Sequence, residues 1–312
     1  MVDLLTLALS GILSVRANSL APSTSTPQSF VARQIHHRQT GQRQDTTLIE
    51  KASWVEIEFV GARMFSGQQL LAEMRHPRDP ARPNQLALQA PVDQEILLDD
   101  LERVRYFLGS RGFLEAKIGK PKFEESGDHM KITVSIEEGT CYLIGNIRVK
   151  GAKLLTPEQI IEISGLRTGE IISARVVSEK VYKGINNIYR DHGYIQSDVD
   201  IKPNFRPIYP GAPVGIVDIT LEIEEGKVFF INSIDFHGLV KTDEQSLRDL
   251  LLIRKGDRFS RRMFVETLKR FNQLGLFEEI EEKDVITRTN DKDNQVELTI
   301  QIKEIVKEID RQ

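Results

Sequence analysis

The amino-acid sequence predicts an α+β protein built from three tandem modules, each with the element order β-α-α-β-β. In every module a glycine, Gly61, Gly151 or Gly238, closes a short run of alternating apolar and polar residues. A Ser/Thr-x-x-Gln sequence follows each glycine and is typical of a helix N-terminus. The glycines lie 90 residues (61 to 151) and 87 residues (151 to 238) apart, spacings longer than those of short solenoid repeats. The repeats are therefore expected to be small domains.

The start of each module predicts a strand with one buried face, followed by a helix. Alternation with a period of two is the signature of such a strand. It is seen in Val55, Ile57 and Phe59, in Ile147 and Val149, and in Ile234 and Phe236. A Ser or Thr oxygen can accept from the N3 amide while the Gln reaches back to the cap amide. The boxes are Ser66…Gln69, Thr156…Gln159 and Thr242…Gln245.

A second helix is predicted in each module from apolar residues spaced three or four apart, which fall on one helix face. The stripes are Leu97, Leu101, Val104 and Leu108; Val177, Val181, Ile185 and Ile188; and Phe264, Leu268 and Phe271. Ser173 and Ser260 are expected N-caps. Each helix is expected to end at a glycine in the left-handed conformation, namely Gly112, Gly193 or Gly275.

Two further strands complete each module. The last strand alternates strongly: Ile132, Val134, Ile136; Val217, Ile219, Leu221, Ile223; Val296, Leu298, Ile300, Ile302. The strand before it alternates weakly and is rich in charge, as expected of an edge strand: Leu114, Ala116, Ile118; Ile195, Val199, Ile201; Phe277, Ile280, Val285. Each module is thus predicted to be a three-stranded mixed sheet covered on one face by two helices.

These patterns divide the chain into modules at 53–138, 139–226 and 227–305, with a short tail at 306–312. Residues 1–19 carry an apolar stretch with small-residue sites after it, typical of a signal peptide, although Asp3 stands where a basic residue is usual; a mildly apolar tail is the alternative. Residues 20–52 predict a disordered linker. The four prolines within 76–94 indicate an insertion, which we interpret as a tolerated surface loop rather than a functional one.

Composition and motifs argue against several functions. A net charge of −4 and a pI near 6.0 do not favour nucleic acid as a partner, and no apolar run reaches the length of a membrane helix. The single cysteine, Cys141, is expected to be a structural thiol. Nucleotide-binding and nucleophile motifs are absent, and no spaced ligand set predicts a metal or cofactor. Glu137-Glu138 and Glu224-Glu225 are interpreted as solvated turns, so no enzyme is expected.

The repeat resembles the POTRA domain, most closely the arrays of BamA-type outer-membrane assembly proteins. The likeness covers roughly residues 54–304. It is carried by the strand openings 145–151 (Gly-Asn-Ile-Arg-Val-Lys-Gly) and 232–238 (Asn-Ser-Ile-Asp-Phe-His-Gly) and by the turns 167–170 and 254–257, which read Arg-x-Gly-Glu and Arg-x-Gly-Asp. The resemblance implies a periplasmic scaffold, at the inner face of the outer membrane, that receives unfolded outer-membrane proteins and contacts assembly lipoproteins.

The resemblance also implies binding by β-augmentation, in which an extended segment adds a strand to an open sheet edge. The expected edges are 194–202 and 277–286. Their expected partner-binding residues are Tyr194, Ile195, Ser197, Val199, Ile201, Phe277, Ile280 and Val285. The family's arrays usually precede a membrane β-barrel, and no such run follows Glu304, so a separate β-barrel subunit or a split or truncated protein is expected.

A second function stays open. The modules could instead form a structural interaction module that docks one fixed partner, as POTRA-like units do in cell-division or two-partner-secretion proteins. Those relatives typically carry one or two units, so three modules favour the assembly scaffold.

Overall fold

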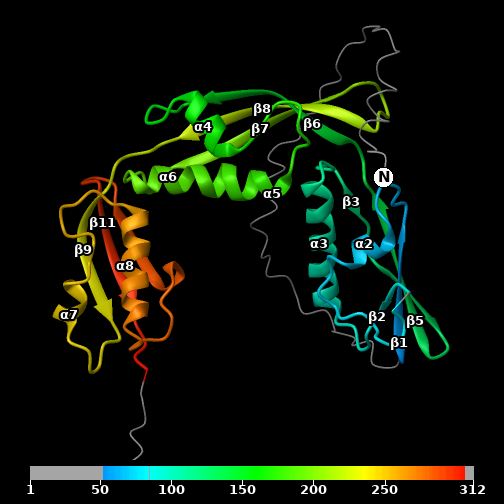
Figure 1. Cartoon of the computed structure of the whole chain (residues 1–312), viewed down its shortest axis with the longest axis horizontal. Coiled ribbons are helices and arrows are strands. Elements are labelled where there is room, and N and C mark those ends of the chain that lie inside the picture. Colours follow the sequence, from blue (N-terminus) through cyan, green and yellow to red (C-terminus); the bar gives the residue numbers. More distant parts are fainter. Residues whose placement is uncertain (1–51, 84, 306–312) are drawn as a thin grey trace, which may run out of the picture. The chain divides into compact units, whose positions relative to one another are not determined.

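The computed structural model describes residues 52–83 and 85–305 (Figure 1). Its described part contains three small sheets, each accompanied by helices, and confirms the α+β class with three tandem modules. Contacts divide the described chain into two compact units: one holds the residues up to Arg148 with 165–178 and 201–220, and the other holds the rest. The predictions for 1–19 and 306–312, and nearly all of that for 20–52, lie outside the described residues.

The first module contains a sheet in the order β2-β1-β5-β3, with β4 also paired to β5. Its strands are β1 (Trp54–Val60), β2 (Ala87–Leu88), β3 (Lys117–Ile118), β4 (Lys122–Ser126) and β5 (His129–Glu137). β1 runs parallel to β5, whereas β3 and β4 pair with it antiparallel. The helices α2 (Gly67–Leu71) and α3 (Gln94–Ser110) bury their apolar faces against this sheet, so the predicted Leu97 stripe is confirmed.

The Pro-rich segment 76–94 is part of this fold, and the interpretation as a tolerated surface loop is wrong. Its Ala87 and Leu88 form β2 beside β1, and Leu88 and Val92 are fully buried. The buried carboxylate of Asp100 in α3 accepts the backbone N–H of His76 at 3.0 Å and contacts its ring Nδ1 at 2.7 Å. Prolines disfavour a helix here, and these contacts fasten the segment to the core.

The middle module contains a sheet in the order β6-β8-β7, with β6 (Cys141–Lys150), β7 (Asp198–Pro207) and β8 (Val214–Glu224). Its first helix is α4 (Pro157–Ser164), and the Thr156–Gln159 box forms both predicted hydrogen bonds. Ser173 occupies the expected N-cap position of the second helix but makes no side-chain capping bond.

The second helix of the middle module is continuous but not a regular α-helix. It comprises α5 (Ala174–Val176), a π-helical stretch (Val177–Ile185) and α6 (Asn186–Asp191). The π turn, with i→i+5 hydrogen bonds, is wider than an α turn. A constant spacing of four residues therefore stays on the buried face along the whole helix. The buried positions are Val177, Val181, Ile185 and Tyr189. Tyr189 therefore takes the place that the sequence pattern gave to Ile188, which is only half-buried.

The third module contains a sheet in the order β10-β11-β9, with β9 (Phe230–His237), β10 (Val285–Asn290) and β11 (Gln295–Gln301). β11 runs parallel to β9 and antiparallel to β10. The helices are α7 (Glu244–Arg248), α8 (Arg261–Gln273) and a short 3-10 turn, η3 (Glu282–Asp284). The apolar face of α8 belongs to the same core cluster as the buried residues of β11, and Ser260 caps its N-terminus, both as predicted. Figure 1 shows this helix beside the sheet.

The predicted Thr242–Gln245 box is wrong by one residue. Asp243 is the N-cap of α7, and its carboxylate accepts the backbone N–H of Ser246 at 3.2 Å. The N–H of Thr242 instead donates to Glu304 at 2.8 Å. A carboxylate at the N-cap also interacts favourably with the positive end of the helix dipole, which explains why aspartate displaces threonine here.

Candidate partner-binding edges

One edge of every sheet is covered by the chain itself. In the middle module the turn 167–170 and the residues after it cover β6: Ile144 donates to the Glu170 carbonyl at 2.8 Å and accepts from Gly169 at 2.7 Å. In the third module Ile231 makes the same pair with Asp257 and Gly256, both at 2.8 Å. In the first module β2 occupies the corresponding side of β1. The Arg-x-Gly-Glu/Asp turns therefore protect these edges from unwanted pairing.

The opposite edges are open. β7 and β10 are the outermost strands of their sheets, and among the described residues no strand or bridge pairs with their outer sides. The side chains of β10 are exposed after Val285. An outermost strand presents unpaired N–H and C=O groups that can accept another strand. Both strands come directly before the last strand of their module, where the sequence predicted an edge strand.

Only three of the eight predicted site residues lie in the open edge strands. Val199 and Ile201 lie in β7 with buried side chains, and Val285 is the first residue of β10. Tyr194, Ile195 and Ser197 lie in the turn before β7, and Phe277 and Ile280 lie in the segment before β10. The expectation of strands over all of 194–202 and 277–286 is therefore wrong, and β10 continues to Asn290.

Side-chain hydrogen bonds explain why 277–281 is not a strand. The side chain of Asn272 in α8 donates to the Ile280 carbonyl and accepts the Ile280 N–H, both at 2.9 Å. Phe277 and Ile280 are buried in the core of the third module, and Phe277 makes only an isolated bridge to Glu304. The apolar residues that looked like a weak strand thus form a loop fixed to the helix.

The two open edges differ in their backbone donors. β7 contains Pro203 and Pro207, and a proline inside a paired strand lacks the N–H that would otherwise face the open side. β10 reads Val-Ile-Thr-Arg-Thr-Asn without proline. Ile286 is an exposed apolar residue on it. β10 therefore offers the more complete hydrogen-bonding edge.

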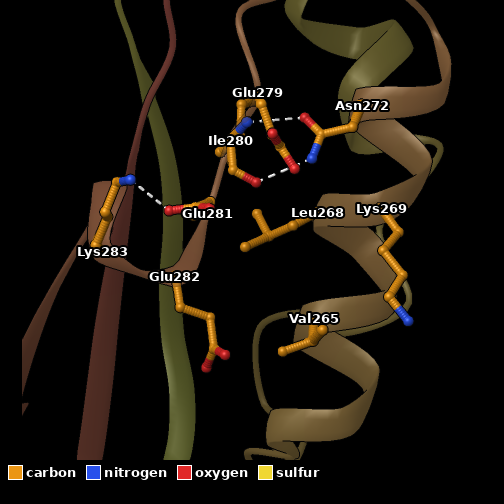
Figure 2. Close-up of a pocket in the computed structure, with 9 residues that line it drawn as sticks. All are labelled: Val265, Leu268, Lys269, Asn272, Glu279, Ile280, Glu281, Glu282 and Lys283. Carbon is orange, nitrogen blue, oxygen red and sulfur yellow. Dashed lines mark hydrogen bonds and ion pairs between the residues drawn. The ribbon is translucent and has the colours of Figure 1, made fainter. Parts of the chain in front are cut away.

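A shallow groove lies next to the start of β10, between α8 and the segment 279–283 (Figure 2). Its volume is about 410 Å³. Val265 and Leu268 form its apolar floor on the helix side, and Glu279, Glu282 and Lys269 surround it (Figure 2). Lys283 and Glu281 make an ion pair at its rim. The groove is continuous in sequence with the open strand and can receive side chains of a bound segment.

Three glutamates hold the loop after the first strand in each module. Glu138 accepts the backbone N–H groups of Arg63 and Met64 at 3.1 and 2.9 Å. Glu225 accepts those of Lys153 and Leu154 at 2.6 and 2.7 Å. Glu138 is buried, so interpreting the Glu-Glu pairs as solvated turns is wrong for their second members. The repetition of Ile-Glu-Glu was the sequence signal that could have identified this role.

The third glutamate of this kind, Glu304, accepts from three successive N–H groups, those of Val240, Lys241 and Thr242, at 3.1, 2.9 and 2.8 Å. The bond from Thr242 is the main reason that its pKa is lowered, to about 2. Burial by itself would raise the pKa of Glu225. Hydrogen bonds from the backbone of Leu154 and Lys153 and from the Tyr189 hydroxyl outweigh burial, so the pKa of Glu225 is lowered. Hydrogen bonds to the charged form have this effect in general.

Glu304 is expected to make the stability of the third module depend on pH. A folded-state pKa near 2, below the ordinary 4.5, stabilises the fold at pH values above 4.5, and this contribution is lost as the pH falls through 2. Glu304→Gln should therefore lower the denaturation midpoint at pH 7, and the difference from the wild type should shrink steadily below pH 4.5.

Urea denaturation at several pH values checks this dependence. Glu266→Gln, which changes an exposed side chain of α8 in an ion pair with Lys269 at 3.7 Å, is the control and should change the midpoint little. A Glu304→Gln effect that is equal at pH 7 and pH 2.5 would contradict the assignment.

The element order, the covered first-strand edges and the repeated glutamates define a class of small β-α-α-β-β domain repeated in tandem. A family model described as "POTRA: Surface antigen variable number repeat" matches residues 54–139, 142–226 and 229–305. These matches cover most of the chain, so it belongs to the POTRA family.

The relatives include "Outer membrane protein assembly factor BamA" of Nitratidesulfovibrio vulgaris, 22% identical over 68% of this chain, and that of Neisseria meningitidis, 23% identical over 76%. The chain spans only 26% and 30% of the length of those proteins. Among solved structures, POTRA domains 3–5 of Haemophilus influenzae BamA match with a TM-score of 0.66 at 18% identity, covering 81% of this chain and 96% of that one. This match supports the fold.

The part of the chain that the structure describes has neither a candidate membrane helix nor a candidate metal site. None of its helices has the length and apolar character needed to cross a membrane. No group of three or more His, Cys, Asp or Glu side chains there is arranged to hold a metal ion.

Proposed function

We propose that the chain is a non-enzymatic periplasmic scaffold that binds unfolded outer-membrane proteins by β-augmentation and supports the assembly of outer-membrane β-barrels. Membership of the POTRA family and the likeness to BamA support a role in outer-membrane protein assembly. The observation that carries the binding mode is the pair of open sheet edges, β7 and β10, beside first-strand edges that are covered. Backbone pairing needs little from the client's sequence, which suits a varied class of clients.

The main client edge in this proposal is β10. Its register with β11 is regular from Val285 to Asn290, so its outer side presents evenly ordered donors and acceptors to an added strand. β7 is the secondary edge because Pro203 removes a donor. Of the eight predicted site residues, Val199, Ile201 and Val285 lie in the proposed edge strands. The other five lie in the segments that precede these strands and are not proposed to pair with a client.

The proposed location is the periplasmic face of the outer membrane, and the proposed partners besides clients are assembly lipoproteins or a separate β-barrel subunit. The name of the relatives, outer membrane protein assembly factor, supports a place in outer-membrane assembly. The groove beside α8 favours the second function, docking of one fixed partner, because its apolar floor and charged rim offer side-chain contacts that an edge does not (Figure 2).

Two neighbouring proline substitutions in β10 test the edge. Successive residues of a strand direct their N–H groups to opposite sides, so one of Thr287→Pro and Arg288→Pro removes a ladder bond to β11 and the other removes an outward donor. Only the variant that loses an outward donor should keep the fold, which circular dichroism checks. That folded variant is expected to bind an unfolded outer-membrane protein segment at least about fivefold more weakly, the effect of roughly 1 kcal/mol per hydrogen bond.

Chemical-shift perturbation with millimolar segment measures the affinity and the site. Arg288→Ala, which keeps the backbone donor, is the control and should change the affinity by less than about twofold, since β-augmentation rests on main-chain bonds. Unchanged binding by the folded proline variant would refute the edge. Perturbations confined to Val265, Leu268 and Asn272 would instead favour the fixed-partner function.

A further inference from the structure

The two open edge strands approach each other at one point. β10 ends at Asn290, and the carboxylate of the next residue, Asp291, accepts a hydrogen bond from the Gln196 side chain at 2.8 Å. Gln196 comes two residues before β7, which begins at Asp198. These residues belong to one compact unit, so the contact is made within that unit. The end of β10 therefore lies next to the start of β7.

Two further hydrogen bonds hold the strand ends at this place. The Lys227 Nζ donates to the Asp291 carbonyl at 3.0 Å. The carboxylate of Asp191, at the end of α6, accepts the backbone N–H of Arg262 in the first turn of α8 at 2.5 Å, where the helix dipole also favours a negative charge. We call these two bonds, together with the bond from Gln196 to Asp291, the joint.

The two edge strands have the same direction along the path through the joint. β10 runs toward the joint and ends there, whereas β7 begins there and runs away from it. A segment that passes from one edge to the other therefore lies antiparallel to both strands or parallel to both. Because antiparallel and parallel pairing use different hydrogen-bond patterns, a constant direction lets one segment keep one pattern throughout.

Each edge by itself offers few backbone donors and acceptors. β10 has six residues, and β7 has five residues before Pro203. The part of β7 without proline is the part nearest to the joint, so the donors that β7 retains lie next to those of β10. The side chains of Gln196 and Asp291 bridge a backbone gap of roughly 10 Å, which about three residues of extended chain can cross. A segment of about 14 extended residues can therefore pair with both edges.

We propose that β10 and the first part of β7 form one bipartite site, aligned by the joint, in which a single extended client segment pairs with both edges. The bipartite site rests on the proposed function and adds a dependence of affinity on the length of the client segment. Once one half of the segment is paired, the other half binds intramolecularly at a high effective concentration. Two separate short segments, one on each edge, gain nothing from this arrangement.

Two synthetic peptides of alternating valine and threonine, with a lysine at each end, are the probes. One has about 7 residues and the other about 14, the lengths that one edge and both edges accommodate. Each peptide is added to the full chain, and amide shifts measure the affinity and the site. The long peptide is expected to bind at least about tenfold more tightly than the short one, in a one-to-one complex, and to shift the amides of both edges with one dissociation constant.

A spin label at one end of the long peptide tests its direction. A segment that keeps one direction brings the label either to Val285, at the start of β10, or to Ile201 in β7. Only one of these two amide signals should therefore be broadened.

The double variant Asp191→Ala/Gln196→Ala removes two bonds of the joint and changes neither edge strand. It should lower the ratio of long-peptide to short-peptide affinity at least about threefold, because the gain from linking depends on geometry, and it should leave the short-peptide affinity unchanged. Asp293→Ala is the matched control. Asp293 lies in the same turn as Asp291 but accepts from Asn290 of the third module itself, at 2.8 Å, so this variant should keep the wild-type ratio.

A short peptide that binds, with no gain for the long one, would overturn the bipartite site and leave the proposed edge function intact. Two long peptides bound to each chain, a label that broadens both Val285 and Ile201, or an unchanged ratio in the double variant would overturn it as well. Failure of both peptides to bind would overturn the bipartite site together with the proposed function.

Discussion

Gly151→Ala is expected to destabilise the middle module by about 4 kcal/mol or more, a loss that single substitutions reach only through a severe clash or a lost network. Gly151 follows β6 with a φ of 81°, and a Cβ there would lie 2.2 Å from the carbonyl oxygen of Ile223. That oxygen belongs to the backbone of β8, the central strand. The clash can be relieved only by moving the strand, whose Leu221 and Ile223 side chains are buried.

Gly169→Ala separates the clash from the cost of the left-handed conformation. Gly169 has a φ of 87° in the same module, and nothing lies within 4 Å of its Cβ position. Its substitution should cost only about 1–2 kcal/mol, the cost of a left-handed non-glycine residue. Urea denaturation followed by hydrogen exchange at amides of the middle module measures both variants. Equal losses would show that the close approach to Ile223 is not limiting.

The sequence predicted the elements that depend on a single repeated pattern. The last strand of each module is buried on one face in the centre of its sheet, so its alternation is strong and β5, β8 and β11 were all correctly expected. The glycine after the first strand was recognised as a repeated feature, and the structure gives it a positive φ in all three modules. Its contact with the neighbouring strand was not predicted, because the approach of two backbones leaves no residue pattern.

The weaker patterns failed where tertiary contacts override local preference. Phe277 and Ile280 are apolar because a loop buries them against the core, and alternation alone cannot distinguish this from an edge strand. Thr242 looked like a cap, but Glu304, distant in the sequence, binds its N–H. The segment 76–94 lacks periodicity, so the sequence did not show its pairing with β1 or its hydrogen bonds to the buried Asp100 of α3. These three errors thus concern side-chain contacts that the local residue pattern does not record.

Ile185→Ala is expected to lower the free energy of unfolding of the middle module by about 2–5 kcal/mol, the range for truncating a buried large aliphatic side chain. Ile185 is fully buried on the apolar face of the second helix, between Val181 and Tyr189. Ile208→Ala is the control, because Ile208 is 42% exposed and such a change should stay within about 0.5 kcal/mol.

A third variant, Ile188→Ala, tests the helix geometry itself. A regular α-helix places position 188 on the same face as 177, 181 and 185, whereas the π-helical stretch turns Tyr189 inward and leaves Ile188 half-buried. The structure therefore predicts a clearly smaller loss for Ile188→Ala than for Ile185→Ala in the same denaturation and hydrogen-exchange measurement. Equal losses would mean that the helix keeps α-helical spacing in solution, and no loss at Ile185 would place this face outside the core altogether.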